Sequence, residues 1–139
     1  MKMLLNASTL ERLVAHIKVN GVDDQAREAA ESIRRYFNEA APLHHQDEEK
    51  DLFPLLLTLS PDFKGTICQL NSEHETMEDS WRVLDELLSD PGAIADLDAF
   101  EELAQVFGQA YRDHIKEEEA EILMPIDGKL NPQQLEQLG

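Results

Sequence analysis

The sequence has little of several features that identify whole classes of protein. Its single cysteine, Cys68, allows no disulfide within the chain and suits a reducing compartment. No apolar run approaches the roughly 18 residues of a membrane span, and residues 1–9 hold too few apolar side chains for a signal peptide. The sequence therefore predicts a cytoplasmic protein with no membrane partner.

Basic residues are also scarce relative to acidic ones. The 12 Lys and Arg residues against 29 Asp and Glu residues give a formal net charge of −17. Nucleic acid repels such a chain, whereas cations are concentrated near it. The composition predicts no nucleic-acid partner and is compatible with cation binding.

Alternating runs of β-branched residues are almost absent, so we expect no β-sheet. Four segments instead show the apolar spacing of amphipathic helices, at about 3–19, 23–58, 60–89 and 97–123. Asp23 and Ser60 are expected to cap the second and third segments, and Gly21 to follow the end of the first. Pro42 is expected to kink the second segment or split it into about 23–40 and 42–58.

The short connections between these segments favour an all-α fold, an antiparallel up-down four-helix bundle. The chain of 139 residues is interpreted as one domain, 1–139. Its short C-terminal tail, 127–139, is expected to begin a helix at Asn131-Pro132.

Three of the four apolar stripes are interrupted by side chains that can bind metals. His74 is the polar member of the third stripe, and His114 with Glu118 continues the fourth. Burying unpaired imidazoles and carboxylates would cost several kcal/mol each, which a bound metal would offset. The third stripe is Phe63, Ile67, Leu70, His74, Met77, Trp81, Leu84 and Leu88, and the fourth is Phe100, Leu103, Phe107, Tyr111, His114, Glu118 and Ile122.

The second segment offers two ligand pairs. His44 with Glu48 and His45 with Glu49 both have the i, i+4 spacing that places two side chains on one helix face. The apolar stripe of this segment includes His44 and Glu48. The first pair is therefore preferred, and His45 and Glu49 are expected to point away from the site. The full stripe of this segment is Ile33, Phe37, Ala40, His44, Glu48, Leu52, Leu55 and Leu59.

Two further choices concern the other helices. Glu119 is five residues after His114 and points about 140° away from it, so Glu118 is preferred. His16 lies beside the apolar stripe of the first segment rather than in it. It is either a fourth histidine ligand or a histidine at the surface.

The donor set discriminates among metals. The chain has five histidines. Four or five histidine ligands together with two carboxylates are more than the four ligands of a structural zinc site. Imidazoles exclude the all-oxygen ligation typical of Ca²⁺ or Mg²⁺, whereas a mixed set with bridging carboxylates suits two non-haem iron ions. No histidine follows a glutamate by three residues, which disfavours a ferritin-like site. The predicted ligands are His16, His44, Glu48, His74, His114 and Glu118.

These motifs resemble those of a known family. The segment from His44-His45 to Pro54 resembles the second-helix motif of hemerythrin-like (HHE cation-binding) domains. The segment 111–119 resembles their fourth-helix motif, and His74 is similar to their third-helix histidine. The resemblance covers nearly the whole chain. It implies a four-helix bundle with a di-iron centre, in which two carboxylates bridge the irons.

The sequence departs from this family at two positions. The histidine usual near the start of the first helix would fall just before Met1, which leaves His16 as the candidate. Glu78 stands where the family's third helix has a second histidine. These departures make partial or single-metal occupancy the alternative to a complete pair of ions.

The resemblance implies a protein that binds O₂ or a similar diatomic molecule, for oxygen binding or sensing or for iron handling. One alternative is a di-iron enzyme acting on peroxide or nitric oxide. The sequence shows no general acid or nucleophile beyond the ligands, so this ranks second. Another is a metal-free acidic helical module that binds other proteins. Phe37, Met77, Trp81 and Tyr111 are expected to line the pocket for the diatomic ligand.

Overall fold

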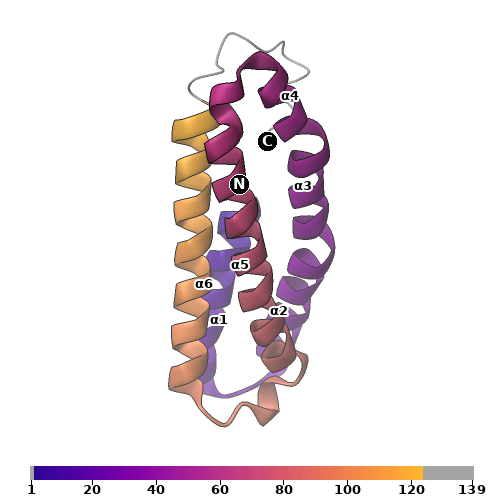
Figure 1. Ribbon diagram of the computed structural model, residues 1–139. Helices are drawn as coiled ribbons and strands as arrows, with labels where there is room; N and C mark the ends of the chain where they lie inside the picture. The colour runs from indigo at the N-terminus through magenta and orange to yellow at the C-terminus, as the bar shows by residue number, and fades with distance from the viewer. Residues whose placement is uncertain (1, 124–139) are drawn as a thin grey trace.

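The computed structural model describes residues 2–123, which are helical apart from short connections and contain no strand (Figure 1). The all-α prediction is therefore confirmed for these residues. The predicted helix at Asn131-Pro132 lies outside them. None of the described helices combines the length and the apolar character needed to cross a membrane. In chain order the elements are α1 (Lys2–Asn20), α2 (Asp24–Arg35), η1 (Tyr36–Ala40), α3 (Ala41–Asp47), η2 (Glu48–Leu52), α4 (Phe53–Leu59), η3 (Pro61–Phe63), α5 (Lys64–Ser89), η4 (Pro91–Ala93), α6 (Leu97–Glu118) and η5 (Glu119–Leu123).

Local capping fixes most of the helix boundaries. The Asp23 side chain accepts a hydrogen bond of 2.8 Å from the Ala26 backbone N–H, and Ser60 accepts one of 3.2 Å from Asp62. Both satisfy N–H groups that lack a partner within the helix. Gly21, after α1, has a φ of 76°, a left-handed conformation that glycine adopts without steric cost. The expected caps and the expected end of the first helix are confirmed.

The helical stretch from α2 to α4 continues through Pro42, so the predicted split, one of the two expectations for this proline, does not occur. A π turn, η1, ends two residues before Pro42, and a second, η2, ends two residues before Pro54. Each closes with a hydrogen bond across five residues, from Ala41 to Tyr36 and from Phe53 to Glu48. Proline lacks an N–H and crowds the preceding turn of an α-helix. The wider π turn accommodates it within a continuous helix.

Each π turn takes up one more residue than a turn of α-helix, so the buried face moves along the sequence. After Phe37 the buried residues are Ala41, His45, Glu48, Leu52, Phe53 and Leu56. The predicted members Ala40 and Leu59 are exposed. The predicted stripe was right at Glu48 and Leu52 but wrong at Ala40 and Leu59, because it assumed an unbroken α-helical period. The stripe of α5 has no such interruption, and its buried positions are those predicted from Ile67 to Leu88.

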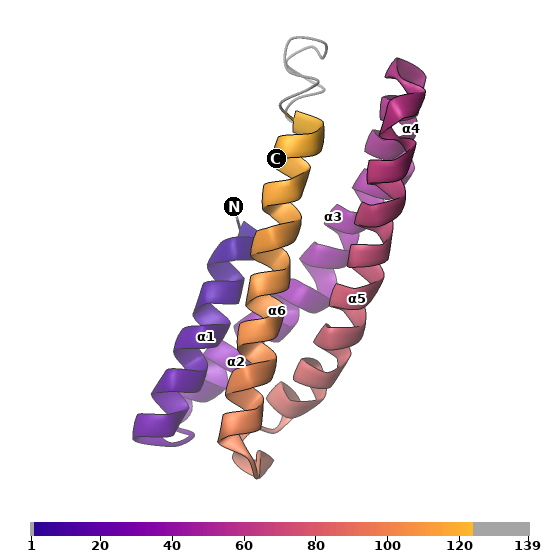
Figure 2. The ribbon, with the colours of Figure 1, turned by 60° about the vertical axis from the view of Figure 1, so that its left-hand side comes forward.

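The four helical stretches lie side by side, and the α1–α2 and α5–α6 connections lie at the same end of the molecule (Figure 1, Figure 2). Both α1 and α5 pack against α2 and against α6. Two separate apolar clusters result. The large core includes Leu10, Phe37, Met77, Phe100 and Phe107. The small core consists of Leu52, Phe53, Leu56, Ile67, Leu70 and Ile122.

Between the two cores lies a layer of buried polar side chains, which we call the polar layer: His45, Glu48, His74, His114 and Glu118. Along α5, His74 is preceded by Leu70 of the small core and followed by Met77 of the large core. Along α6 and η5, His114 and Glu118 lie between Tyr111 and Ile122. The fold thus encloses these polar groups in apolar packing, where they need partners.

Candidate metal centre

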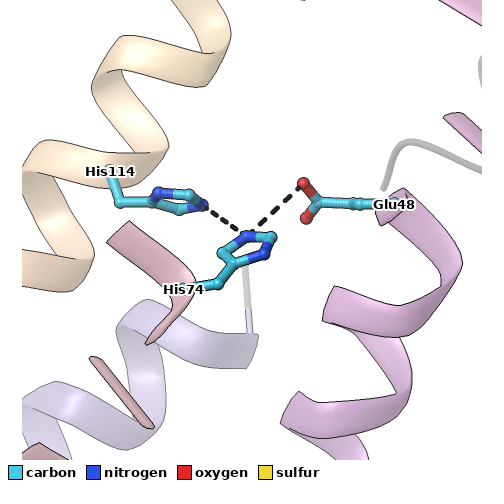
Figure 3. Close-up of side chains that lie close together, drawn as sticks. All are labelled: Glu48, His74 and His114. Carbon is cyan, nitrogen blue, oxygen red and sulfur yellow. Dashed lines mark hydrogen bonds and ion pairs between the residues drawn. The ribbon is translucent and has the colours of Figure 1, made fainter. Parts of the chain in front are cut away.

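Three residues of the polar layer converge on one point. Glu48 comes from the start of η2, His74 from the middle of α5 and His114 from the last turns of α6 (Figure 3). Each offers one ligand atom, and these atoms all lie within 4.8 Å of one another. His74 Nε2 is 3.1 Å from His114 Nε2 and 3.9 Å from Glu48 Oε2. All three residues are buried.

In both His74 and His114 a carboxylate binds Nδ1, the ring nitrogen on the outer side of the cluster. His74 Nδ1 lies 3.0 Å from Glu49 Oε1, and His114 Nδ1 lies 3.0 Å from Glu73 Oε1. A carboxylate oxygen accepts, so each Nδ1 carries the proton and donates it. Carboxylate–histidine pairs of this kind orient the imidazoles of metal sites and fix their tautomer.

The other ring nitrogens, Nε2 of His74 and of His114, face each other inside the cluster without a proton between them. Burial lowers the pKa of His74 to about 4 and also lowers that of His114. Both rings are therefore neutral near pH 7. With the protons on Nδ1, the two Nε2 lone pairs face each other at 3.1 Å and repel. The Glu48 carboxylate beside them accepts no hydrogen bond of good geometry. A cation between these atoms would remove the repulsion, and the donor set therefore fits a metal ion.

Glu118 extends the cluster on the α6 side. Its Oε2 lies 3.5 Å from His114 Nε2. Burial and the neighbouring Glu48 carboxylate raise the pKa of Glu118 to about 9, so it holds a proton near pH 7. Burial would raise the pKa of Glu48 too, but the His44 ring holds it below its usual value. Glu119 is exposed, so the predicted burial of Glu118 rather than Glu119 is confirmed.

The structure reverses the expected orientation of the two neighbouring histidines. His45 is 3% exposed, and its ring stacks on His74 with centroids 4.0 Å apart. His44 is half-buried, with Nε2 2.6 Å from Glu48 Oε1. The π turn η1 causes this change, because it advances the buried face by one residue before His45. Pro42 was the signal in the sequence that could have indicated the π turn.

His16 is not brought to this cluster. His16 lies in the last turns of α1. Its Nε2 is 2.9 Å and 3.0 Å from the two carboxylate oxygens of Asp23. Asp23 is the residue that caps α2. His16 therefore connects the end of α1 to the start of α2, and we leave it out of the site.

Glu49 and Glu73 were missed as functional candidates. Each acts on the histidine of another helix, since Glu49 binds His74 of α5 and Glu73 binds His114 of α6. Glu49 was set aside with His45, and Glu73 is a neighbour of His74 in sequence but not its partner. No spacing within one helix indicates such a pair.

Comparisons with known proteins agree with this geometry. The family model described as hemerythrin HHE cation binding domain matches residues 2–126. An uncharacterized protein of Haemophilus influenzae is 34% identical over 110 residues, which cover 79% of this chain. The alignment covers 64% of that relative, so the chain spans less than two thirds of its length. No solved structure gives a significant match. The match of nearly the whole chain shows that the protein belongs to the hemerythrin HHE cation-binding domain family.

Proposed function

We propose that this protein is a non-haem di-iron protein that binds O₂ or a similar diatomic molecule. The observation that supports it best is the pair of facing Nε2 atoms of His74 and His114, 3.1 Å apart and beside the buried Glu48 carboxylate. Family membership and the acidic chain both favour a cation at this point.

In this proposal Glu48, His74 and His114 hold one ion. His44, Glu48 and Glu118 are the residues that would hold a second ion. His44 is placed for this by its Nε2, 2.6 Å from Glu48 Oε1. Bound iron supplies a redox-active Lewis acid with an open coordination position for a small ligand. Occupancy by a single ion is the alternative, because the close group contains three ligand residues.

The remaining residues orient and enclose the site. Glu49 and Glu73 hold the two imidazoles with Nε2 directed inward. The large and small cores pack on either side of the polar layer and keep water away from it. Without a metal, Glu118 holds a proton at the edge of the cluster, which it would lose on binding an ion. We further propose that the helices keep the up-and-down antiparallel order. Each helix packs against two neighbours, and the connections between successive helices are short.

The test is metal analysis combined with absorption spectroscopy. Protein reconstituted with Fe²⁺ without air should retain iron after desalting, and its absorption spectrum should change on exposure to air and return on reduction. His16→Gln is the matched control and should retain as much iron as the wild type. A colourless, iron-free protein after reconstitution would overturn the proposal and favour the metal-free acidic bundle.

A further inference from the structure

A pocket beside the three-residue cluster lies between the η1–α3 segment and α5, and its lining includes the four residues expected from the sequence to enclose a diatomic ligand. Its volume is about 170 Å³. The buried side chains of Phe37, Met77, Trp81 and Tyr111 line its inner part. Exposed residues, among them Glu78, lie at its mouth. The pocket is therefore a concave, mostly apolar cavity with a polar rim, as small-molecule sites usually are.

His45 lines this pocket and has no hydrogen-bond partner. Neither ring nitrogen makes a hydrogen bond, although the side chain is almost wholly buried. Glu78 Oε1 is 3.7 Å from Nδ1, which is too long for a hydrogen bond. A buried imidazole without partners is unfavourable. A bound molecule with one hydrogen-bonding group would satisfy one of its two ring nitrogens.

The size and lining of the pocket limit what can bind. A cavity of about 150 Å³ with apolar walls holds benzene, so this pocket suits a molecule of that size. Phe37 and Trp81 have ring centroids 4.9 Å apart, and flat aromatic groups pack well against such rings. Arg82 at the rim forms an ion pair of 2.8 Å with Asp79, which leaves no unpaired cation for an anion. A net charge of −17 also opposes anions.

We propose that this pocket binds a small, uncharged, flat molecule with one hydrogen-bonding group, which pairs with His45. Phenol is a suitable probe. The His45 ring is stacked on His74, so the ligand would lie one ring away from the candidate metal centre. The binding itself requires no metal, and its failure is therefore distinguishable from failure of the di-iron proposal.

The test is a titration of the protein with phenol, before and after treatment with a chelator. Trp81 is the only tryptophan in the chain and lines the pocket, so its fluorescence reports occupancy. Calorimetry gives the affinity. Phenol should bind saturably to both samples and more tightly than toluene, which has the same shape without the hydroxyl group. Binding that is absent, limited to the metal-loaded sample or no tighter than that of toluene would overturn the proposal.

A substitution separates the hydrogen bond from the shape of the pocket. His45→Leu should weaken phenol binding roughly three- to tenfold, the effect of losing one hydrogen bond, and leave toluene binding unchanged. His16→Leu, far from the pocket, is the matched control and should change neither. An equal loss for phenol and toluene, or no loss for phenol, would contradict the assignment to His45. If His45→Leu does not fold, the comparison of phenol with toluene on the wild type still decides.

Discussion

Two helical stretches meet in the polar layer and supply it in different ways. Helix α5 is a regular α-helix from Lys64 to Ser89 and provides His74 from a stripe of uniform spacing. The stretch from α2 to α4 contains two π turns and provides both His45 and Glu48. On this second stretch each π turn shifts the buried face along the sequence, so the register of the buried residues changes twice. Helix register, rather than residue type alone, therefore determines which of two adjacent histidines is buried.

The π turns are also close to the buried carboxylates. Glu48 is the first residue of η2, and Glu118 immediately precedes η5. The π turns η1 and η2 each end two residues before a proline, Pro42 and Pro54, and the third π turn of the described residues, η5, reaches the last of them, Leu123. Single π turns inside α-helices are rare and concentrate at functional sites. To the polar layer the regular α5 contributes a histidine only, whereas the helical stretches that contain π turns contribute its two carboxylates.

The largest expected effect comes from deleting one residue in each stretch. Deletion of Glu75 from α5 would rotate one half of its stripe by about 100° against the other, and we expect it to unfold the protein. Deletion of Glu39 from η1, combined with Pro42→Ala, would convert the π turn to α-helix and keep the later register. We expect that variant to remain folded, with a loss of at most about 3 kcal/mol.

Both deleted residues are exposed, which makes the pair a matched comparison. Chemical denaturation followed by circular dichroism measures the free energy of unfolding of each variant. Equal stability losses from the two deletions would show that η1 does not absorb a residue.

The next effect concerns the ligand supplied by α5. His74→Ala should abolish retention of iron after desalting while the protein stays helical, because the cluster loses one of its inner nitrogens. Elemental analysis and circular dichroism together measure this. Iron content equal to that of the wild type would remove His74 from the site.

A smaller effect is expected from the carboxylates that orient the imidazoles. Glu49→Gln and Glu73→Gln should each weaken metal affinity roughly 10- to 100-fold, because an amide fixes the imidazole less firmly than a carboxylate. Competition with a coloured chelator gives the affinity. Glu75→Gln, exposed on α5, is the matched control and should have no effect. A loss of the same size in the control would attribute the change to net charge alone.

The smallest effect is the pH dependence that His45 contributes to the metal-free protein. Burial, with a smaller contribution from His74, lowers the pKa of His45 to about 3, whereas the unfolded chain has a value near 6.5. Below about pH 6.5 the unfolded state therefore binds more protons, and stability falls as the pH falls. The stability of the wild type relative to His45→Leu should decrease by about 1 kcal/mol per pH unit between pH 6 and 5. Denaturation at several pH values measures the difference, and a constant difference would show that His45 is accessible to protons in the folded state.

Much of the fold and part of the site could be predicted from local sequence. The spacing of apolar residues placed α5 and α6, and the same spacing identified His74, His114 and Glu118 as buried. The prediction worked there because a regular helix repeats the same geometry at each turn. On the stretch from α2 to α4 it was right at Glu48 and Leu52 but chose His44 in place of His45, because a π turn breaks that repetition.

The sequence by itself determined which segments are helical, where they are capped, and which faces of α5 and α6 are buried, since these depend on residues within one or two turns of one another. Only the tertiary structure decided the rest. It paired Glu49 with His74 and Glu73 with His114, and bound His16 to Asp23. Each pairing joins residues of different helices. Such contacts depend on how the helices pack, which no spacing within a single helix specifies.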